Sequence, residues 1–370
     1  MCFRTFVPMK NNNKDVYVAI MAGGIGSRFW PYSRINKPKQ FLDALNVGNS
    51  LLQQTYERFL NICPKENIFI VTNISYVDMV KKQIEGIGED QILKEPFKRD
   101  TAPCIAYVSK KIHQKNPNAT IIVSPSDHII LKEIAFVKTV NNAIAFVEDK
   151  DILLTLGITP TNPNTGYGYI QYDEDTETEG VFKVKAFTEK PNEELAKQFL
   201  NSGDFLWNSG TFIWKSEAIL NALKKHVPEI YENMSECDNA FYTNEEQTAV
   251  TKAYGACTSI SIDYGVLEKA TNRYVIPANI GWSDIGTWNS LYQAYEKDYL
   301  GNAVNGNAQV FDSFDNMIMG QERKMVVVNG VRNLCIVDTQ DVLLITTRER
   351  EQEIKKITVE LKNKDLEKFL

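Results

Sequence analysis

Short, uniformly apolar runs alternate with amphipathic stretches through the first half of the chain. The runs Val16–Met21, 67–71, 119–123 and Leu153–Ile158 are apolar at nearly every position, as is typical of strands buried on both faces. Between them, apolar residues recur at helical spacing over 51–60, 101–113 and 134–147. The alternation predicts an α/β fold with a mostly parallel, Rossmann-like sheet and helices on both faces.

The pattern changes near residue 300. Short apolar runs at 308–311, 317–319, 325–328, 334–337 and 342–345 are separated by turn residues, and a charged stretch follows over 348–370. Closely spaced short strands predict a small β domain, either a sheet or a short coil of β-structure. We therefore expect a disordered N-terminal extension at 1–15, a main domain at 16–300, and a β domain at 301–370 that ends in a charged helix.

Composition removes several classes of function. The 370 residues are 43% hydrophobic and 24% charged, with 41 Lys and Arg against 47 Asp and Glu, so the net charge is −6. An acidic chain without a basic block is a poor partner for nucleic acid or an anionic membrane, and no stretch resembles a membrane span. Six scattered cysteines without a C-x-x-C motif and three histidines argue against structural zinc and fit a reducing cytoplasm.

A glycine-rich stretch follows the first strand: Ala22, Gly23, Gly24, Ile25, Gly26, Ser27 and Arg28. Glycines let backbone N–H groups approach phosphate oxygens closely. The dinucleotide fingerprint fails because Phe29 stands where it needs glycine, and the G-K-[ST] ending of a P-loop is missing. A purely structural turn is the alternative, but Arg28 favours phosphate because a guanidinium binds phosphate bidentately.

Further charged residues could complete a phosphate site. Arg34 and Lys39 lie in the next loop, and with Arg28 they would offset the charge of two or more phosphates. Asp127 follows a buried strand, and Asp284 lies in a glycine-flanked turn. One or two carboxylates together with substrate phosphates commonly hold Mg²⁺, although each Asp could equally cap a turn.

Two polar, aromatic segments suit a sugar pocket. Residues 165–169 and 207–210 combine glycine, amide, hydroxyl and aromatic groups, which can stack against a sugar and hydrogen-bond to it. Both could also be tight turns with core aromatics. Glu189 and Lys190 follow a strand of alternating pattern, where a surface ion pair is the plainer interpretation.

Taken together, the motifs resemble one family. The segments 22–31, 38–41, 95–103, 125–128, 164–170, 187–191, 207–210, 261–265 and 281–288 resemble, in this order, the signature of the sugar-1-phosphate nucleotidylyltransferases. Trp30-Pro31 with Pro38-Lys39-Gln40-Phe41 is similar to the mannose-1-phosphate guanylyltransferase branch, and the β segment after residue 301 is similar to the small C-terminal β domain of its short-form members. The resemblance covers roughly residues 16–291.

The resemblance implies a reaction and a set of roles. GMP would pass from GTP to mannose 1-phosphate by Mg²⁺-assisted in-line attack on the α-phosphorus, giving GDP-mannose and pyrophosphate. Arg28 and Lys39 would be catalytic, and Asp127 and Asp284 would hold the metal. The nucleotide would contact Ala22, Gly23, Gly24, Gly26, Ser27, Arg28, Pro125 and Asp127, whereas the sugar phosphate would contact Gly166, Glu189, Lys190 and Asn208. The small β domain of such enzymes implies a homodimer.

Two alternatives stay open at this point. One is the same chemistry with another pair of hexose 1-phosphate and nucleoside triphosphate, because base choice depends on pocket geometry. The other is a non-catalytic regulatory subunit that binds nucleotide sugar. A silent subunit would be expected to lose Arg28, Lys39, Asp127 or Asp284, and all four are present.

Overall fold

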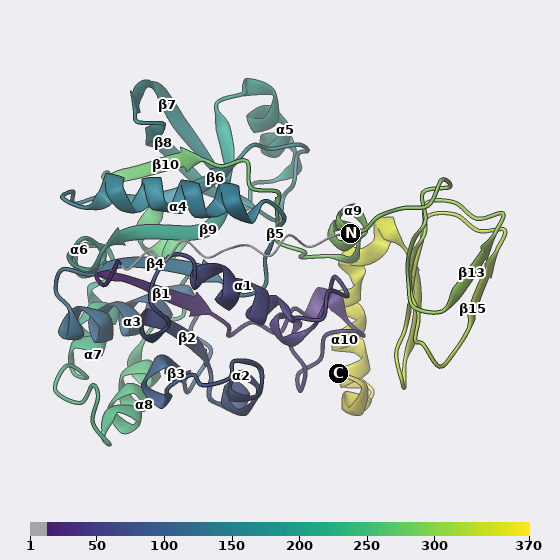
Figure 1. Ribbon diagram of the computed structural model, residues 1–370, viewed down its shortest axis with the longest axis horizontal. Coiled ribbons are helices and arrows are strands. Elements are labelled where there is room, and N and C mark those ends of the chain that lie inside the picture. Colours follow the sequence, from purple (N-terminus) through teal and green to yellow (C-terminus); the bar gives the residue numbers. More distant parts are fainter. Residues whose placement is uncertain (1–12) are drawn as a thin grey trace. The chain divides into compact units, whose positions relative to one another are not determined.

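The computed structural model describes residues 13–370, which group into two compact units (Figure 1). The first unit holds the residues up to Gly23 together with Thr55–Ser126 and Ile130–Trp282, and the second holds Gly24–Gln54, Asp127–Ile129 and Ser283–Leu370. Residues 1–12 of the expected N-terminal extension lie outside the described residues. The domain boundary expected near residue 300 follows sequence position, whereas the two units above are grouped by contacts. That boundary stays a prediction.

A nine-stranded sheet forms the centre of the first unit, in the order β3-β2-β1-β4-β9-β6-β10-β8-β7. Strands β3, β2, β1 and β4 are parallel neighbours, whereas β9 is antiparallel to both β4 and β6. The strands are β1 Val16–Met21, β2 Ile68–Asn73, β3 Ile92–Glu95, β4 Thr120–Pro125, β6 Leu153–Ile158, β7 Gly168–Thr178, β8 Val181–Glu189, β9 Phe205–Lys215 and β10 Arg273–Pro277. The predicted α/β class is confirmed.

The antiparallel strand β9 corrects one sequence interpretation. Its middle, Trp207 to Gly210, reads in sequence as a possible tight turn, but here it belongs to the strand and pairs with β6 through Asn208 and Gly157, with Gly210 at a φ of +71°. The register between β6 and β9 shifts at this point, between Thr155 and Gly157. An irregular stretch inside a strand, which the sequence pattern does not distinguish from a turn, therefore carries these polar groups.

Helices cover both faces of the sheet. Tyr17 and Ala19 of β1 join a core with Ile105 and Val108 of α3, whereas Phe59 of α1 packs edge-on against Phe136 of α4, with ring centroids 5.7 Å apart. Helix α4 lies along strand β9 (Figure 1). The helices are α1 Leu51–Phe59, α2 Val77–Gln83, α3 Thr101–Lys115, α4 Glu133–Val147, α5 Glu193–Ser202, α6 Ser216–His226, α7 Pro228–Ser235 and α8 Glu246–Ala256.

The C-terminal part of the second unit is a short coil of β-structure. Strands β12, β14 and β16 pair in parallel, β17 adds to them antiparallel, and β13 pairs in parallel with β15 (Figure 1). The elements are α9 Trp288–Ala294, β12 Ala303–Asn305, β13 Ala308–Phe311, β14 Met317–Met319, β15 Val326–Asn329, β16 Leu334–Asp338, β17 Leu343–Thr347 and α10 Ile354–Asn363, and the short β5 Ile129–Ile130 and β11 Trp282–Ser283 complete the set. The expected small C-terminal β region is confirmed.

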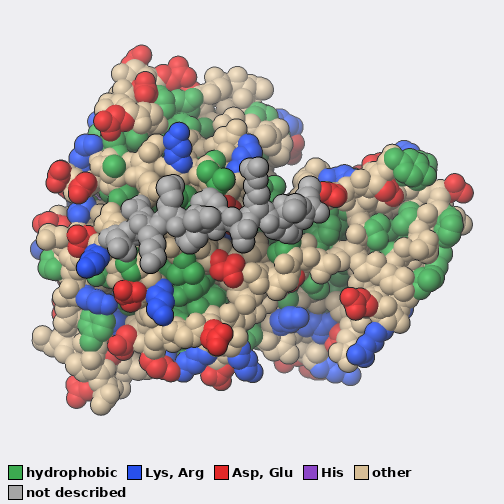
Figure 2. All heavy atoms as spheres, viewed as in Figure 1, with side chains coloured by type: hydrophobic (Ala, Val, Ile, Leu, Met, Phe, Trp, Pro, Cys, Tyr) green, Lys and Arg blue, Asp and Glu red, His purple; other side chains and the backbone are tan. Residues whose placement is uncertain are grey.

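Mixed charge covers the face of the described residues drawn in Figure 2, where acidic and basic side chains are interspersed. Among residues 13–370, no helix has the length and apolar character needed to cross a bilayer.

Two buried asparagines connect successive turns of the β coil. Asn302 accepts hydrogen bonds from the backbone and side-chain N–H groups of Asn316 at 3.1 and 2.9 Å, and it donates to Ser313 O at 2.9 Å. Asn316 in turn accepts from the Leu334 N–H at 2.9 Å. Each amide therefore satisfies buried backbone groups that the strand pairing leaves over.

Asn316→Ala is expected to lower the free energy of unfolding by about 1–3 kcal/mol, because it leaves the partly buried Leu334 N–H without its partner and removes one of the two hydrogen bonds from Asn316 to Asn302 Oδ1. Urea denaturation of the full chain measures the change. The matched control is Asn307→Ala, at an exposed position between β12 and β13. Equal midpoints for the two variants would contradict the role assigned to Asn316.

Candidate active site

A cavity of about 290 Å³ in the second unit gathers residues from distant parts of the sequence. We call it the basic cavity, and its lining residues are Gly26, Ser27, Arg28, Lys39, Asp127, His128, Asp284, Gly286 and Lys355. Six of these were singled out from the sequence: Gly26, Ser27, Arg28, Lys39, Asp127 and Asp284. Lys355, which lies in α10, is not part of any of the sequence motifs.

Lys39 is the buried centre of this cavity. Only 3% of the residue is exposed, and its ammonium donates to Asp127 Oδ2 at 3.0 Å and to the carbonyl oxygen of Asp284 at 2.5 Å. Gly26 makes the approach possible, because its φ is +73° and an added Cβ would lie 2.6 Å from the Cβ of Lys39. The close contact of the glycine-rich loop with Lys39 thus requires glycine at position 26.

The charge of Lys39 keeps Asp127 ionised. Burial alone would raise the pKa of Asp127, but the Lys39 ammonium and the nearby His128 outweigh it and hold that pKa below its usual value. The Nε2 atom of His128 lies 3.9 Å from Asp127 Oδ1. The cavity therefore presents a carboxylate beside a buried ammonium group.

Asp127 and Asp284 provide the chemistry that a hard divalent cation needs. Both line the basic cavity, and one oxygen of Asp284 accepts the Gly286 N–H at 2.9 Å. Within residues 13–370, no group of three or more His, Cys, Asp or Glu side chains could hold a metal by itself. Two carboxylates without further protein ligands fit Mg²⁺ bound together with substrate phosphates, which complete its oxygen coordination.

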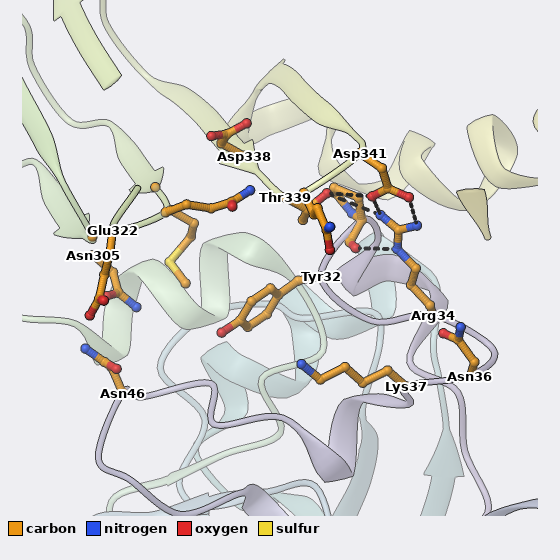
Figure 3. Close-up of a pocket in the computed structure, with 16 residues that line it drawn as sticks. Tyr32, Arg34, Asn36, Lys37, Asn46, Asn305, Glu322, Asp338, Thr339 and Asp341 are labelled. Carbon is orange, nitrogen blue, oxygen red and sulfur yellow. Dashed lines mark hydrogen bonds and ion pairs between the residues drawn. The ribbon is translucent and has the colours of Figure 1, made fainter. Parts of the chain in front are cut away.

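Arg34 does not join the basic cavity, contrary to the sequence expectation. It lines a separate cavity of about 870 Å³ in the second unit, where its guanidinium bonds to both oxygens of Asp341, at 2.5 and 2.8 Å, and to Thr339 (Figure 3). The reason is that Asp341, in the turn between β16 and β17, neutralises it. Loop position alone could not reveal this partner, which lies 307 residues away.

Three of the four expected sugar-phosphate residues lie in one cluster of the first unit. We call it the sugar-side cluster, and these three residues are Glu189, Lys190 and Asn208. The Asn208 amide donates to Asp263 Oδ1 at 2.9 Å, and its oxygen accepts from Gly210 N and Thr155 Oγ1 at 3.0 and 3.2 Å. The side chains of Asn208 and Glu189 both pack against Gly168: an added Cβ there would lie 2.4 Å from Glu189 Oε2 and 3.3 Å from Asn208 Cβ. The Glu189 carboxylate pairs in turn with Lys190.

The fourth residue, Gly166, lies in the turn before β7, where its N–H bonds to Asn164 Oδ1 at 2.7 Å. The neighbouring Tyr167 ring packs edge-on against Trp207 and Trp282, with ring centroids 4.9 and 5.2 Å away. These aromatic side chains therefore form one packed group with Trp207 buried, and their part in a sugar pocket stays a prediction.

Asp263 belongs to the sugar-side cluster, although the sequence analysis gave it no role. Burial raises its pKa to about 7, the charge of Glu189 adds to the rise, and Lys190 and Asn208 partly oppose it. The residue begins a five-residue π-helix, Asp263–Leu267, a rare geometry that is frequent at functional sites. Its place inside the 261–265 motif was the signal that could have identified it.

A second buried acid, Glu95, lies against the start of the glycine-rich loop. An added Cβ on Gly23 would come within 3.0 Å of Glu95 Oε2, and Tyr254 donates to Glu95 Oε1 at 3.1 Å. Burial raises the pKa of Glu95 to about 7, and the Tyr254 hydrogen bond only partly lowers it. The Glu95 carboxyl group therefore lies close to the backbone at the start of the glycine-rich loop, where its oxygens can accept hydrogen bonds.

The remaining expected nucleotide contacts lie at the ends of adjacent strands. Met21 and Pro125 are register partners across β1 and β4, so Ala22, Gly23 and Pro125 come together at the carboxyl edge of the sheet. The Ala22 N–H donates to Val71 O at 2.7 Å, and Ala22 O accepts from Thr72 Oγ1 at 2.8 Å. This edge is where open α/β sheets bind their ligands.

Two protein-family models match this chain. The nucleotidyl transferase family model matches residues 17–299. The chain belongs to this family. A second model, the MannoseP isomerase/GMP-like beta-helix domain, matches residues 306–361, which contain most of the β coil and most of α10. The family expected from the sequence motifs is confirmed.

Individual relatives are similar over most of the chain. A mannose-1-phosphate guanylyltransferase of Salmonella montevideo is 37% identical over 351 residues, which are 93% of this chain and 73% of the relative. The alginate biosynthesis protein AlgA of Pseudomonas aeruginosa is 34% identical over 92% of this chain and 71% of its own length. A crystal structure titled mannose-1-phosphate geranyltransferase, from Thermus thermophilus, superposes with a TM-score of 0.85 at 27% identity and covers 94% of this chain and 99% of that one.

The buried Glu95 carboxyl is expected to make stability depend on pH. Its pKa rises from the ordinary 4.5 to about 7 on folding, so between those values the folded protein binds a proton that the unfolded chain does not. Its contribution to stability is therefore lost as the pH rises from about 4.5 to 7, by about 1.4 kcal/mol per pH unit.

Urea unfolding of the wild type and of Glu95→Gln at pH 5.5 and pH 7.5 tests this. The wild type should lose more stability between the two pH values than the variant, because Gln does not titrate. Glu66→Gln, at an exposed position of the same unit, is the control and should retain the wild-type difference. An unchanged difference in Glu95→Gln would refute the assignment.

Proposed function

We propose that this protein transfers GMP from GTP to mannose 1-phosphate, with release of pyrophosphate. The observation that carries the proposal is the basic cavity, where a glycine-rich loop and a buried, carboxylate-paired Lys39 lie together. Phosphoryl chemistry needs this combination of fixed cations and backbone donors. Relatives named mannose-1-phosphate guanylyltransferase, 36–37% identical over more than nine-tenths of the chain, support the choice of substrates.

The reaction joins two anions, so alignment and charge stabilisation are the main tasks of the protein. A phosphate oxygen of mannose 1-phosphate attacks the α-phosphorus of GTP in line, and the bond from that phosphorus to the pyrophosphate oxygen breaks. Lys39 stabilises the charge that develops around the α-phosphoryl group. Its two fixed acceptors hold the ammonium in place before reaction, so little reorganisation is needed.

The nucleotide would lie along the glycine-rich loop. Arg28 binds the triphosphate, and the loop N–H groups add donors without side chains in the way. The residues in this role are Ala22, Gly23, Gly24, Gly26, Ser27, Arg28, Pro125 and Asp127. The positive φ of Gly26 supports it, because this conformation shapes the loop around Lys39.

Mg²⁺ would be held by Asp127 and Asp284. When bound there, it would neutralise the negative charge of the substrate phosphates. The depressed pKa of Asp127 supports this role, because the carboxylate is available as an oxygen donor at any pH near neutrality.

Mannose 1-phosphate would bind through the sugar-side cluster. Gly166, Glu189 and Asn208 contact mannose hydroxyls, and Lys190 binds the sugar phosphate. The Lys190 ammonium is half-exposed and pairs with Glu189, so it can receive phosphate while its partner accepts a hydroxyl hydrogen bond. Asp263 holds the Asn208 amide in orientation for this task.

The direct test is pyrophosphate release from GTP and mannose 1-phosphate by the full chain, with and without EDTA. Release should depend on the metal, and it should be faster with mannose 1-phosphate than with glucose 1-phosphate, and with GTP than with UTP or ATP. Folded protein that releases no pyrophosphate from GTP and mannose 1-phosphate would refute the proposal.

Asp127→Asn and Asp284→Asn are each expected to lower kcat/KM by about a hundredfold or more, because each removes a charge that faces the reacting phosphates. Circular dichroism and the thermal midpoint should show that both variants fold. Asp149→Asn, at an exposed position outside the cavity, is the control. Near-normal turnover of both variants at limiting Mg²⁺ would remove the metal assignment.

The homodimer and the cytoplasmic location stay predictions. Sedimentation equilibrium of the purified chain measures the first, and fractionation of the source cells measures the second.

A further inference from the structure

A third cation lines the basic cavity, and it comes from the end of the chain. Lys355 is the second residue of α10, and it shares the cavity with Ser27, Arg28 and Lys39. It lies more than 300 residues away from the glycine-rich loop in the sequence. The family signature described above ends near residue 291, so no motif points to it.

The start of α10 is held firmly beside the loop. Helix α10 contacts the turn Ser27–Phe29, and Ile354, next to Lys355, is fully buried in one apolar cluster with Phe29 and Trp30. Trp30 Nε1 also donates to Phe369 O at 2.7 Å, which ties the segment after α10 to the same loop. The buried Ile354 therefore fixes the backbone of Lys355 beside the loop, and the exposed Lys355 side chain lines the basic cavity from there.

Charged groups around the start of α10 also place it beside the glycine-rich loop. Burial raises the pKa of Glu351, one turn before Lys355, and Arg28 is among the cations that partly oppose the rise, so Arg28 lies close to this turn. The Lys39 ammonium already donates hydrogen bonds to the Asp127 carboxylate and to the Asp284 carbonyl. Within residues 13–370, the Lys355 side chain forms no ion pair or hydrogen bond, so its ammonium is available to an anion.

We propose that Lys355 binds the β- and γ-phosphates of the nucleoside triphosphate, and therefore the pyrophosphate that leaves. The inference rests on the proposed function, which brings the triphosphate to the glycine-rich loop. Because α10 packs on the turn Ser27–Phe29, Lys355 approaches from the loop side of the cavity, whereas Lys39 is fixed by the Asp127 carboxylate and the Asp284 carbonyl. The C-terminal helix thus supplies a substrate-binding residue in addition to its structural contacts.

The chain offers a matched control in the adjacent residue. Lys356 is exposed on the same helix and does not line the basic cavity, because neighbouring helical residues point about 100° apart. Lys355→Met and Lys356→Met remove the same charge from the same element. Any difference between them therefore reports on the cavity and not on net charge or helix propensity.

The first measurement is binding of magnesium pyrophosphate to the full chain by calorimetry, with no nucleotide or sugar present. Lys355→Met should weaken binding about tenfold or more, because it removes a charged donor to phosphate. Lys356→Met should bind as the wild type does, and Lys355→Arg should recover most of the loss. Equal affinities for the two Met variants would overturn the proposal.

Steady-state kinetics supply the second measurement. Lys355→Met should raise the KM for GTP, and the KM for pyrophosphate in the reverse reaction, by about tenfold or more, while the KM for mannose 1-phosphate changes less than twofold. An equal rise in all three constants, or a thermal midpoint lowered only in Lys355→Met and not restored by Lys355→Arg, would assign Lys355 a structural role and reject the proposal.

Failure of the proposed function gives a different result. A wild type that binds pyrophosphate but does not turn over GTP with mannose 1-phosphate would reject that reaction, whereas the comparison of Lys355→Met with Lys356→Met would still decide the role of Lys355.

Discussion

The buried ammonium of Lys39 is the interaction on which the second unit depends. A cation that is only 3% exposed is stable only if fixed acceptors replace its water, and here Asp127 and the Asp284 carbonyl do so. These acceptors come from the separate segments Asp127–Ile129 and Ser283–Leu370, while Lys39 belongs to Gly24–Gln54. One charge therefore connects all three segments of this unit, and Gly26 lets the loop approach it closely.

Buried acids play the corresponding part in the first unit. Glu95 and Asp263 both have a pKa raised to about 7, chiefly by burial, and each lies beside a residue assigned to substrate binding: Gly23 and Asn208, respectively. Carboxyl groups with perturbed pKa values cluster at functional sites, because the same burial that costs stability concentrates their interactions with a ligand. Their positions thus support the two substrate assignments by an argument independent of sequence motifs.

The β coil and the helix after it are integrated with the loop that precedes them in the sequence by hundreds of residues. Asp341 neutralises Arg34, Phe369 accepts a hydrogen bond from Trp30, and Lys355 lines the basic cavity. The first contact removes a cation that the loop sequence offered, and the last supplies another. The number of positive charges is similar to the expectation, but one of them comes from a different part of the chain.

The sequence alone determined the buried parallel strands and the family, and its motifs contained most of the residues that line the basic cavity. Val16–Met21 and Leu153–Ile158 are apolar at nearly every position, so their burial on both faces was readable from the sequence, and the ordered motifs included Lys39, Asp127 and Asp284. Only the tertiary structure decided that 207–210 is strand, that Arg34 is neutralised, that Asp263 contacts Asn208, and that Lys355 lines the basic cavity. Local patterns record burial and turn chemistry, whereas the partner of a charged side chain is set by long-range packing, which local patterns do not encode.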